Sequence, residues 1–593
     1  MNRVLPVLLL VVSMLFARNA VAAPPTDASI QAAIEGFTPL WAAPRGELAG
    51  WVIALDPGDE APAATAPRLD DDLSLLTGGL LYHFVHEARA GAILLRSDDT
   101  LSTDSGRDRR GQRFDVTRGR DCDVCVVLRY APDRTEPAVS PLGERATDVQ
   151  LSADLAAALN VPLQTGARAG LTVDASVAAA ICCVELPRPG AATAIDVPVR
   201  RACFENARRI YGGIRAYCAA AKTARPTPVR SPADADGDTP NVRGPATSVG
   251  RTLWPAGRLP SAQADWFCDL FGRVSITARS LVYFDVTATG DEGITIRGNT
   301  NVPRLALGLE KALHDAGIEQ VRNEIRALPD REQLGERLFG ACRAPMALTY
   351  MKPGNAGGRQ TQILFGEPLF LLTRRDGCYL LLAGDGYWGW VDETAVEPLT
   401  ADQFDAYVRH PVAVLLRDIT AQEVFVPRGA RVRLAETGAD PRILLPAGGA
   451  LAAPADALRI DTPEEGAQRR VAAALELLYV PYVFGARSPL GVDCSGLVTS
   501  AWMRDGRTPA RDVWQQAFAG ELVATAWHRT NIRAGDQLFF IRDSGKLYHT
   551  AIALDATHFV HSSPPCVLIS SFDPHDPLYE EEYERYFFMA KRP

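Results

Sequence analysis

The sequence predicts a multidomain chain in which α/β, small β-barrel and α+β domains follow one another. The chain has 593 residues, whereas one domain usually spans roughly 100–200 residues. Residues 223–250 are rich in Pro, Asp and Gly and show no hydrophobic period, which is typical of a linker. Hydrophobic residues make up 47% and charged residues 22% of the chain, the balance of ordinary globular domains.

The first 22 residues, 1–22, have the features of an export signal. Arg3 is followed by an apolar run and then by Ala20 and Ala22, the small-residue spacing that signal peptidase reads. The apolar run is too short to cross a bilayer comfortably, which takes about 20 residues. We therefore expect cleavage before Ala23, a periplasmic or secreted protein, and no membrane anchor.

The net charge argues against one class of partner, and the cysteines suggest disulfides. A net charge of −9 argues against nucleic acid, because its binding depends on clustered Lys and Arg. Export gives meaning to the 11 cysteines, since disulfides persist outside the cytosol. Some of the six in the N-terminal third are expected to form disulfides, with the pairing left open. These six are Cys122, Cys125, Cys182, Cys183, Cys203 and Cys218.

Strand-like and helix-like segments alternate in residues 23–222, which predicts an α/β domain. The expected strands are 51–55, 92–96, 124–128 and 179–186, with a helix around 73–90. Residues 251–343 predict a smaller α/β module, which loosely resembles BON-type domains. Its expected elements are the strands 281–286, 293–298 and 320–328 and a helix over 303–316 that Pro303 opens.

Two sets of short strands with turn residues follow, over residues 344–398 and 399–462, and predict small β-barrels. The first set resembles bacterial SH3 modules through Thr361-Gln362, through Phe365-Gly366-Glu367 and through the segment 385–390. The second set is similar to a diverged copy of the first.

Residues 463–593 carry the strongest chemical signal. The segment 491–498, Gly-Val-Asp-Cys-Ser-Gly-Leu-Val, predicts a loop that enters a helix, with Asp493 as its N-cap. Cys494 then lies in the first turn, where backbone N–H groups and the helix dipole favour the reactive thiolate. We therefore predict Cys494 as a nucleophile, with Gly496 keeping its approach clear.

A cysteine nucleophile needs a general base and a group that orients this base. Residues 548–554 and 558–561 predict two strands joined by a tight turn. Because side chains alternate along a strand, His549 and His561 face each other in such a hairpin. We predict His549 as the base and His561 as its orienting partner. His528, His558 and His575 are expected to be surface or packing residues.

Residues 468–588 resemble the NlpC/P60 family, which implies a papain-like α+β fold and no metal or cofactor. The resemblance implies that Tyr482 helps to stabilise the oxyanion. It also implies that Asp493, with Tyr387 of the SH3-like module, meets the free amine of an N-terminal L-Ala. The implied reaction is hydrolysis of the γ-D-glutamyl–diamino acid bond of peptidoglycan stem peptides through a Cys494 thioester.

The N-terminal domain resembles zinc-dependent N-acetylmuramoyl-L-alanine amidases through the segments 52–58, 125–128, 184–186 and 210–214. Asp59 and Arg129 stand where that family needs two His ligands, and Asp70 and Glu185 where its Glu ligand and catalytic Glu lie. Because an Arg cation repels a metal, we expect this domain to lack catalytic zinc.

Two alternatives to the peptidase stay open: an acyl hydrolase or transferase that uses the same residues on another amide or ester, and a wall-binding scaffold without catalysis. The intact set of Cys494, His549 and His561 favours an enzyme. The disulfide pairing, the oligomeric state and the preferred third residue of the stem stay open as well.

Overall fold

The computed structural model describes residues 27–37, 48, 51–57, 69–88, 91–94, 123–131, 134–142, 145–164, 180–187, 189, 196–221, 263–290, 293–460, 463–504 and 506–593. The predicted export signal, 1–22, and the predicted linker, 223–250, lie outside the described residues. Within those ranges, no helix combines the length and the apolar character that crossing a bilayer requires.

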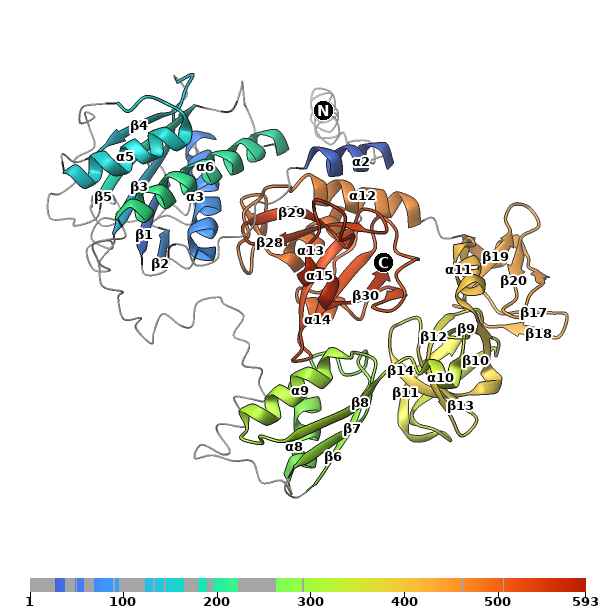
Figure 1. Ribbon diagram of the computed structural model, residues 1–593. Coiled ribbons are helices and arrows are strands. Elements are labelled where there is room, and N and C mark those ends of the chain that lie inside the picture. Colours follow the sequence, from blue (N-terminus) through green and yellow to red (C-terminus); the bar gives the residue numbers. More distant parts are fainter. Residues whose placement is uncertain are drawn as a thin grey trace, which may run out of the picture.

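The N-terminal part is an α/β domain, as predicted (Figure 1). Its sheet has the order β2-β1-β3-β5-β4, in which only the edge strand β4 runs antiparallel to its neighbour. The residues 124–128 of β3 are all at most 2% exposed, as expected for a strand that is covered on both faces. The elements are α2 (Asp27–Gly36), β1 (Val52–Pro57), α3 (Leu69–Glu87), β2 (Gly91–Leu94), β3 (Val124–Ala131), β4 (Ala138–Pro141), α5 (Ala146–Leu159), β5 (Ala180–Pro187) and α6 (Val197–Ala221).

The expected disulfides are absent from the described residues. None of the ten cysteines that the structure describes forms a disulfide, and all ten are buried. Cys182 and Cys203 are 0% exposed within the apolar core, where a thiol packs as a small hydrophobic group. Cys122 lies outside the described residues. The prediction of bridges is therefore wrong for the cysteines that the structure describes.

The next module has a three-stranded sheet, order β6-β7-β8, with β7 and β8 parallel. The predicted strands and helix are confirmed to within a few residues, and the helix α9 begins directly after Pro303. The elements are α8 (Ala264–Val274), β6 (Phe284–Thr289), β7 (Ile294–Thr300), α9 (Arg304–Asp315), β8 (Val321–Ala327) and α10 (Arg331–Leu334).

The region of short strands forms two β-modules. The first is a seven-stranded sheet, order β11-β10-β14-β13-β12-β9-β15, and it includes β9, which begins before residue 344. The second has a five-stranded and a two-stranded sheet, and the helix α11 (Ala401–Arg409) precedes it. The strands of the first module are β9 (Phe339–Cys342), β10 (Met346–Lys352), β11 (Ala356–Leu364), β12 (Pro368–Arg375), β13 (Cys378–Leu382), β14 (Trp388–Asp392) and β15 (Val396–Leu399). Those of the second are β16 (Val412–Leu415), β17 (Ile419–Ala421), β18 (Val424–Val426), β19 (Arg431–Glu436), β20 (Arg442–Leu444), β21 (Ala450–Ala452) and β22 (Leu458–Ile460).

The C-terminal domain has the predicted α+β fold. Its sheet has the order β25-β30-β26-β27-β28-β29, and α13 packs against β27 and β28. A short two-stranded ribbon, β23 with β24, leads into α13. The elements are α12 (Pro463–Leu475), β23 (Arg487–Ser488), β24 (Gly491–Val492), α13 (Cys494–Arg504), α14 (Val513–Gln516), β25 (Glu521–Thr525), β26 (Gln537–Ile541), β27 (Leu547–Ala553), β28 (His558–Ser563), β29 (Cys566–Ser571), α15 (Glu581–Tyr586) and β30 (Phe587–Arg592).

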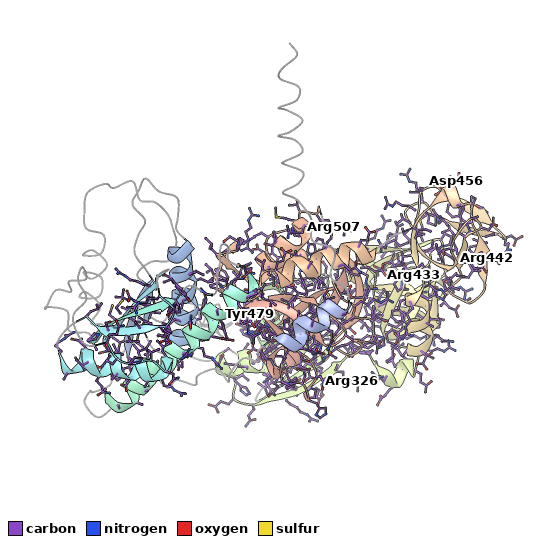
Figure 2. All side chains as sticks on the ribbon, turned by 90° about the horizontal axis from the view of Figure 1, so that it is seen from above. Arg326, Arg433, Arg442, Asp456, Tyr479 and Arg507 are labelled. Carbon is purple, nitrogen blue, oxygen red and sulfur yellow. The ribbon has the colours of Figure 1, made fainter. Side chains whose placement is uncertain are left out.

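The N-terminal domain is seated on the segment 476–482 of the C-terminal domain. Tyr479, which is labelled in Figure 2, stacks on Phe37, with ring centroids 5.4 Å apart, and also contacts Phe204 of α6. Arg200, 4% exposed, donates through Nε to the carbonyl oxygen of Leu478 at 2.8 Å, and through Nη2 to that of Glu476. The two domains share one apolar cluster, an interface that the sequence did not predict.

The first β-module is fixed to the C-terminal domain by polar contacts. Lys591, 1% exposed, donates through Nζ to the carbonyl oxygen of Asp385 at 2.6 Å. The backbone N–H of Leu522 donates to the carbonyl oxygen of Gly384, also at 2.6 Å. Together they hold the turn that precedes Tyr387.

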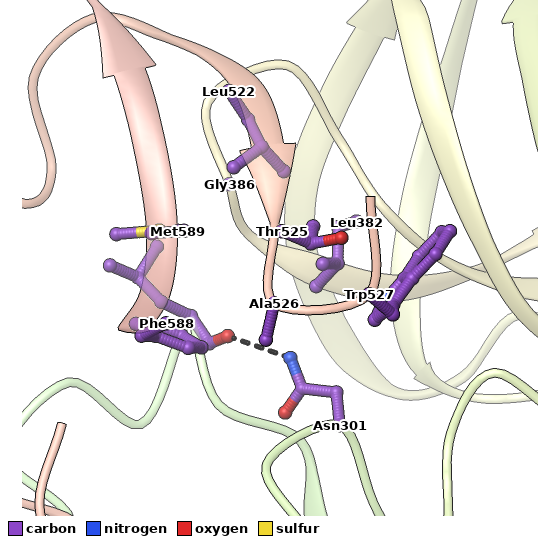
Figure 3. Close-up of a pocket in the computed structure, with 10 residues that line it drawn as sticks. Asn301, Leu382, Gly386, Leu522, Thr525, Ala526, Trp527, Phe588 and Met589 are labelled. Carbon is purple, nitrogen blue, oxygen red and sulfur yellow. Dashed lines mark hydrogen bonds between the residues drawn. The ribbon is translucent and has the colours of Figure 1, made fainter. Parts of the chain in front are cut away.

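A small, mainly apolar pocket lies where three parts of the chain meet (Figure 3). Leu281 and Asn301 belong to the three-stranded module, Leu382 and Gly386 to the first β-module, and the remaining lining to the C-terminal domain. None of the predicted catalytic residues lines this pocket. We therefore interpret it as a junction between domains.

Candidate active site

Cys494 is the first residue of α13, as predicted. The Oδ1 atom of Asp493 accepts the backbone N–H of Gly496 at 2.7 Å, which is the geometry of a helix N-cap. Leu497, Val498, Ala501 and Trp502 form the buried face of the helix, because each is at most 6% exposed. The first turn is therefore held rigidly against the sheet.

Gly496 lies close to the loop that precedes β23. A Cβ atom at this position would lie 2.2 Å from the carbonyl oxygen of Ala486. The loop before β23 thus passes too close to the helix for any side chain. The glycine therefore makes room for this loop, and its predicted role in the approach to the thiol stays a prediction.

Burial raises the pKa of Cys494 to about 12, and the Asp493 carboxylate adds to the rise. Backbone N–H groups of Ser495 and Thr550 act in the opposite direction. The predicted favouring of the thiolate at the helix start is therefore outweighed by desolvation. A pKa raised this far favours the neutral thiol near pH 7, so a reaction that used Cys494 as its nucleophile would need a base to remove the proton.

The predicted pair of histidines is confirmed as a contact. The Nε2 atom of His549, on β27, lies 2.9 Å from the Nδ1 atom of His561, on β28. Burial lowers the pKa of His549 to about 3, helped by Arg542, and burial also lowers the pKa of His561. Both imidazoles are therefore neutral near pH 7, the state in which a general base can accept a proton.

Two further side chains extend the hydrogen bonding beyond His561, and neither was predicted from the sequence. The Nε2 atom of His561 lies 2.9 Å from Oγ of Ser570, on β29. Ser570 in turn donates to Oε1 of Glu580 at 2.6 Å. Strand register places Ser570 beside His561, and the loop before α15 places Glu580 beside Ser570. No short sequence motif therefore links these residues.

Asp493 already accepts hydrogen bonds at all of its usual positions. Besides Gly496, its Oδ1 accepts the hydroxyl of Ser495 at 3.2 Å. Its Oδ2 accepts the N–H of Gly485 and a guanidinium N–H of Arg511, both at 2.7 Å. A carboxylate offers about four lone-pair positions, so an amine would have to replace one of these partners. Arg511 was not predicted as a site residue.

The two tyrosines implied by the resemblance contact other parts of the chain. Tyr482 is held by its main chain: its N–H donates to the carbonyl of Pro565 at 2.9 Å, and its own carbonyl lies 2.6 Å from Nε2 of His83. The ring of Tyr387 packs against Phe518, with centroids 5.8 Å apart. The catalytic and binding roles of these residues stay predictions.

Two of the remaining histidines have carboxylate partners. His528 lies 2.8 Å from Oδ1 of Asp405, in α11, and so joins the β-modules to the C-terminal domain. His558 lies between Asp555 and Asp576, at 2.8 and 2.9 Å, and its pKa is raised mainly by its hydrogen bond to Asp555. These contacts support the expected structural roles.

The N-terminal domain offers no described metal cluster. Among the described residues, no group of three or more His, Cys, Asp or Glu side chains is placed to hold a metal ion. Glu185, 3% exposed, is paired with Arg134, with Oε2 at 2.8 Å from Nη2. Asp59 lies outside the described residues, and the side chain of Asp70 is not described.

The structure thus places a cysteine at the start of a helix that packs on a sheet carrying two hydrogen-bonded histidines. Residues 479–590 match the NlpC/P60 family, and residues 349–396 match the bacterial dipeptidyl-peptidase SH3 domain. The chain is therefore a cysteine peptidase with an NlpC/P60 domain and an SH3 module, in agreement with the resemblance predicted from the sequence.

Two curated relatives are similar to this chain. The γ-D-glutamyl-L-lysine dipeptidyl-peptidase of Bacillus subtilis is 26% identical over 237 residues, which cover 38% of this chain and 78% of the relative. Dipeptidyl-peptidase 6 of Lysinibacillus sphaericus is 34% identical over 126 residues, which cover 20% of this chain and 43% of the relative.

Two solved structures are similar in part. An NlpC/P60 family protein from Bacillus cereus is 18% identical, with a TM-score of 0.20, over 43% of this chain and 99% of that one. The CwlD amidase from Clostridioides difficile is 14% identical, with a TM-score of 0.24, over 29% of this chain and 99% of that one. TM-scores this low carry no weight for function.

Proposed function

We propose that this peptidase hydrolyses the γ-D-glutamyl–diamino acid bond of peptidoglycan stem peptides outside the cytoplasm. The observation that carries the proposal is the hydrogen-bonded pair of neutral imidazoles, His549 and His561, on the strands against which the helix of Cys494 packs. The substrate class is supported by the similar γ-D-glutamyl-L-lysine dipeptidyl-peptidases.

The proposed reaction has two halves. His549 takes the proton of the Cys494 thiol as the sulfur attacks the γ-carbonyl carbon, and the proton then passes to the amine of the diamino acid as the C–N bond breaks. The resulting thioester is attacked by water, which gives its proton to His549. Cleavage of the C–S bond releases the carboxylic acid and restores the thiol. Tyr482 and the backbone N–H of Cys494 support the oxyanion.

Specificity in this proposal comes from the charged groups around Asp493. Arg511 is 35% exposed in its side chain, whereas that of Asp493 is 5% exposed. If the guanidinium turns toward a carboxylate of the stem peptide, Oδ2 of Asp493 becomes available to the free amine of L-Ala. Tyr387, on the turn that Lys591 holds, would contact the same end of the peptide.

We expect that acetylating the N-terminal L-Ala of the peptide lowers kcat/KM strongly. The acetyl group removes the positive charge that would pair with Asp493, at a cost of about 3 kcal/mol or roughly 100-fold. The control peptide carries the same acetyl group on the side-chain amine of the third residue. Equal turnover of the free and the N-terminally acetylated peptides would remove Asp493 and Tyr387 from the recognition of the amine.

A single assay separates this proposal from its two alternatives. The purified chain is incubated with L-Ala-γ-D-Glu-diaminopimelate and with the corresponding lysine peptide, and L-Ala-D-Glu is measured by mass spectrometry. Release of this dipeptide supports the proposed peptidase. Turnover of other amides or esters alone would favour a different acyl hydrolase or transferase. Binding to peptidoglycan without turnover of any substrate would favour a scaffold.

Chelators are expected to leave the activity unchanged, and the N-terminal domain is proposed to bind no catalytic zinc. Arg129 stands at an expected ligand position, and Glu185 is already paired with Arg134, so the described side chains favour an ion pair over a metal. Metal analysis of the full chain should find well below one zinc per molecule. Stoichiometric zinc, with release of L-alanyl peptides from muramic acid, would contradict this expectation.

A further inference from the structure

The histidine pair is part of a longer chain of hydrogen bonds that ends at a carboxyl group. The chain runs from His549 through His561 and Ser570 to Glu580, with successive distances of 2.9, 2.9 and 2.6 Å. It crosses three neighbouring strands, β27, β28 and β29, and ends at the residue directly before α15. The first three members are thus held on strands, and the fourth lies next to a helix.

The middle of this chain is shielded from solvent. His561 and Ser570 are both 0% exposed, and the ring of Tyr583 packs edge-on against His561 at 4.5 Å. In the described part of the structure, the side chain of Glu580 forms a hydrogen bond with that of Ser570 alone. Water is therefore largely kept from competing for these hydrogen bonds.

The carboxylate of Glu580 determines which partner donates in each hydrogen bond of the series. An ionised carboxylate only accepts hydrogen bonds, so Ser570 has to donate to Glu580. The lone pair of Ser570 then accepts Nε2–H of His561, which leaves Nδ1 of His561 without a proton. This Nδ1 accepts Nε2–H of His549, and Nδ1 of His549 is left as the basic atom.

We propose that Glu580 and Ser570 are positioning residues that fix the tautomers of His561 and His549, so that Nδ1 of His549 is free to take the proton of Cys494. Neither residue contacts the substrate or the thiol. They act through the imidazole pair, as the orienting carboxylate of a catalytic triad does through one histidine. This inference rests on the proposed function, since it assigns the base of that reaction.

Protonation of Glu580 would reverse the direction of donation in every hydrogen bond of this series. A carboxylic acid donates to Ser570, Ser570 then donates to His561, and His549 ends with its proton on Nδ1, where it cannot act as a base. Burial raises the pKa of Glu580, the Glu582 carboxylate adds to the rise, and the bond from Ser570 opposes it. The other titratable or charged groups near these residues are Tyr583, which contacts His561, and Arg542, Asp493 and Tyr548, which act on or contact His549.

The sign of the expected pH dependence follows from these shifts. The pKa of Glu580 is raised and that of His549 is lowered to about 3, so on acidification Glu580 takes up its proton before His549 does. The reactivity of Cys494 should therefore decline as the pH falls through the raised pKa of Glu580. Without an ionisable group at position 580, this decline should move to lower pH.

The experiment uses the purified polypeptide with all of its domains, and it has two readouts. The first is the rate at which iodoacetamide alkylates Cys494, followed by mass spectrometry of its peptide between pH 4 and pH 9, which needs no substrate. The second is kcat and KM for release of L-Ala-D-Glu. The variants are Glu580→Gln, Ser570→Ala and their combination. The control is Glu581→Gln, which changes an exposed carboxylate one residue away.

Both single variants should lower the alkylation rate and kcat at pH 7 roughly 10-fold, with KM unchanged, because a positioned base contributes about 10²–10⁴-fold. Glu580→Gln should also move the acidic decline to lower pH. The double variant should lose little more than Ser570→Ala, since both residues act through one path. Glu581→Gln should match the wild type, and thermal melting shows that each variant is folded.

The outcomes separate this inference from the proposed function. If the folded Glu580→Gln variant keeps the wild-type alkylation rate and pH profile, the positioning role is overturned, whether or not the peptide is cleaved. If the wild type cleaves no stem peptide but its alkylation profile shifts in Glu580→Gln, the proposed function fails and the positioning role stands.

Discussion

Replacing Cys494 with Ala will abolish hydrolysis of the stem peptide while leaving the fold intact. The side chain is at the first position of α13 and forms the only bond to the substrate in the proposed reaction. Its removal leaves no group that can form the thioester, and loss of a nucleophile typically lowers kcat by about 10⁴–10⁶-fold. Because alanine favours helices and removes only a sulfur atom, α13 should persist. The rate of L-Ala-D-Glu release by mass spectrometry and the circular dichroism spectrum measure the two effects.

Cys566 provides a matched control for this substitution. It is 0% exposed in β29 of the same domain, and it takes no part in the proposed chemistry. Cys566→Ala should cost some stability through lost packing, about 1 kcal/mol, and yet keep the wild-type kcat per folded molecule. Substantial hydrolysis by Cys494→Ala would show that a different residue is the nucleophile.

Replacing His549 with Ala is expected to have the second largest effect. The resting thiol is neutral because burial raises its pKa, so the reaction depends on a base that removes the proton in the same step. Loss of a positioned base typically lowers kcat by about 10²–10⁴-fold. His561→Ala should lower kcat less, because this residue orients the base and does not itself accept the proton from the thiol. Steady-state kinetics with the same peptide measure both.

His558→Gln is the control for the two histidine variants. His558 lies on the same hairpin, but it pairs with Asp555 and Asp576 and has no part in the chain that reaches His549. Its substitution should change stability and leave kcat near the wild-type value. An unchanged kcat in His549→Ala, or a larger loss in His561→Ala than in His549→Ala, would contradict the assigned roles.

The elements that carry the site were predictable because their signals are local. The apolar stripe after Cys494 predicts a helix, and the alternation around His549 and His561 predicts two strands whose inward faces meet. In both cases a few adjacent residues determine the outcome, through the 3.6-residue and 2-residue periods of helix and strand. The contact between the two histidines follows from this geometry alone.

The partners beyond the histidines were not predictable for the opposite reason. Ser570 and Glu580 reach His561 through strand register and a loop, and Arg511 reaches Asp493 across the first turn of α13. Nothing in the adjacent sequence distinguishes these residues from ordinary polar ones. The burial that raises the pKa of Cys494 was not predictable either, because the helix start is a local feature, whereas burial is the sum of distant contacts.

The contact between the N-terminal domain and the segment 476–482 affects how readily the catalytic domain could be transferred to another protein. The match to the NlpC/P60 family begins at Tyr479. The ring of this residue packs against Phe37 and Phe204. A chain cut at that point would leave this aromatic ring and the carbonyl acceptors of Arg200 without their cover. A segment that carried only residues 479–590 into another protein would thus expose this apolar surface, and we expect it to be less soluble than the catalytic domain together with its N-terminal neighbour.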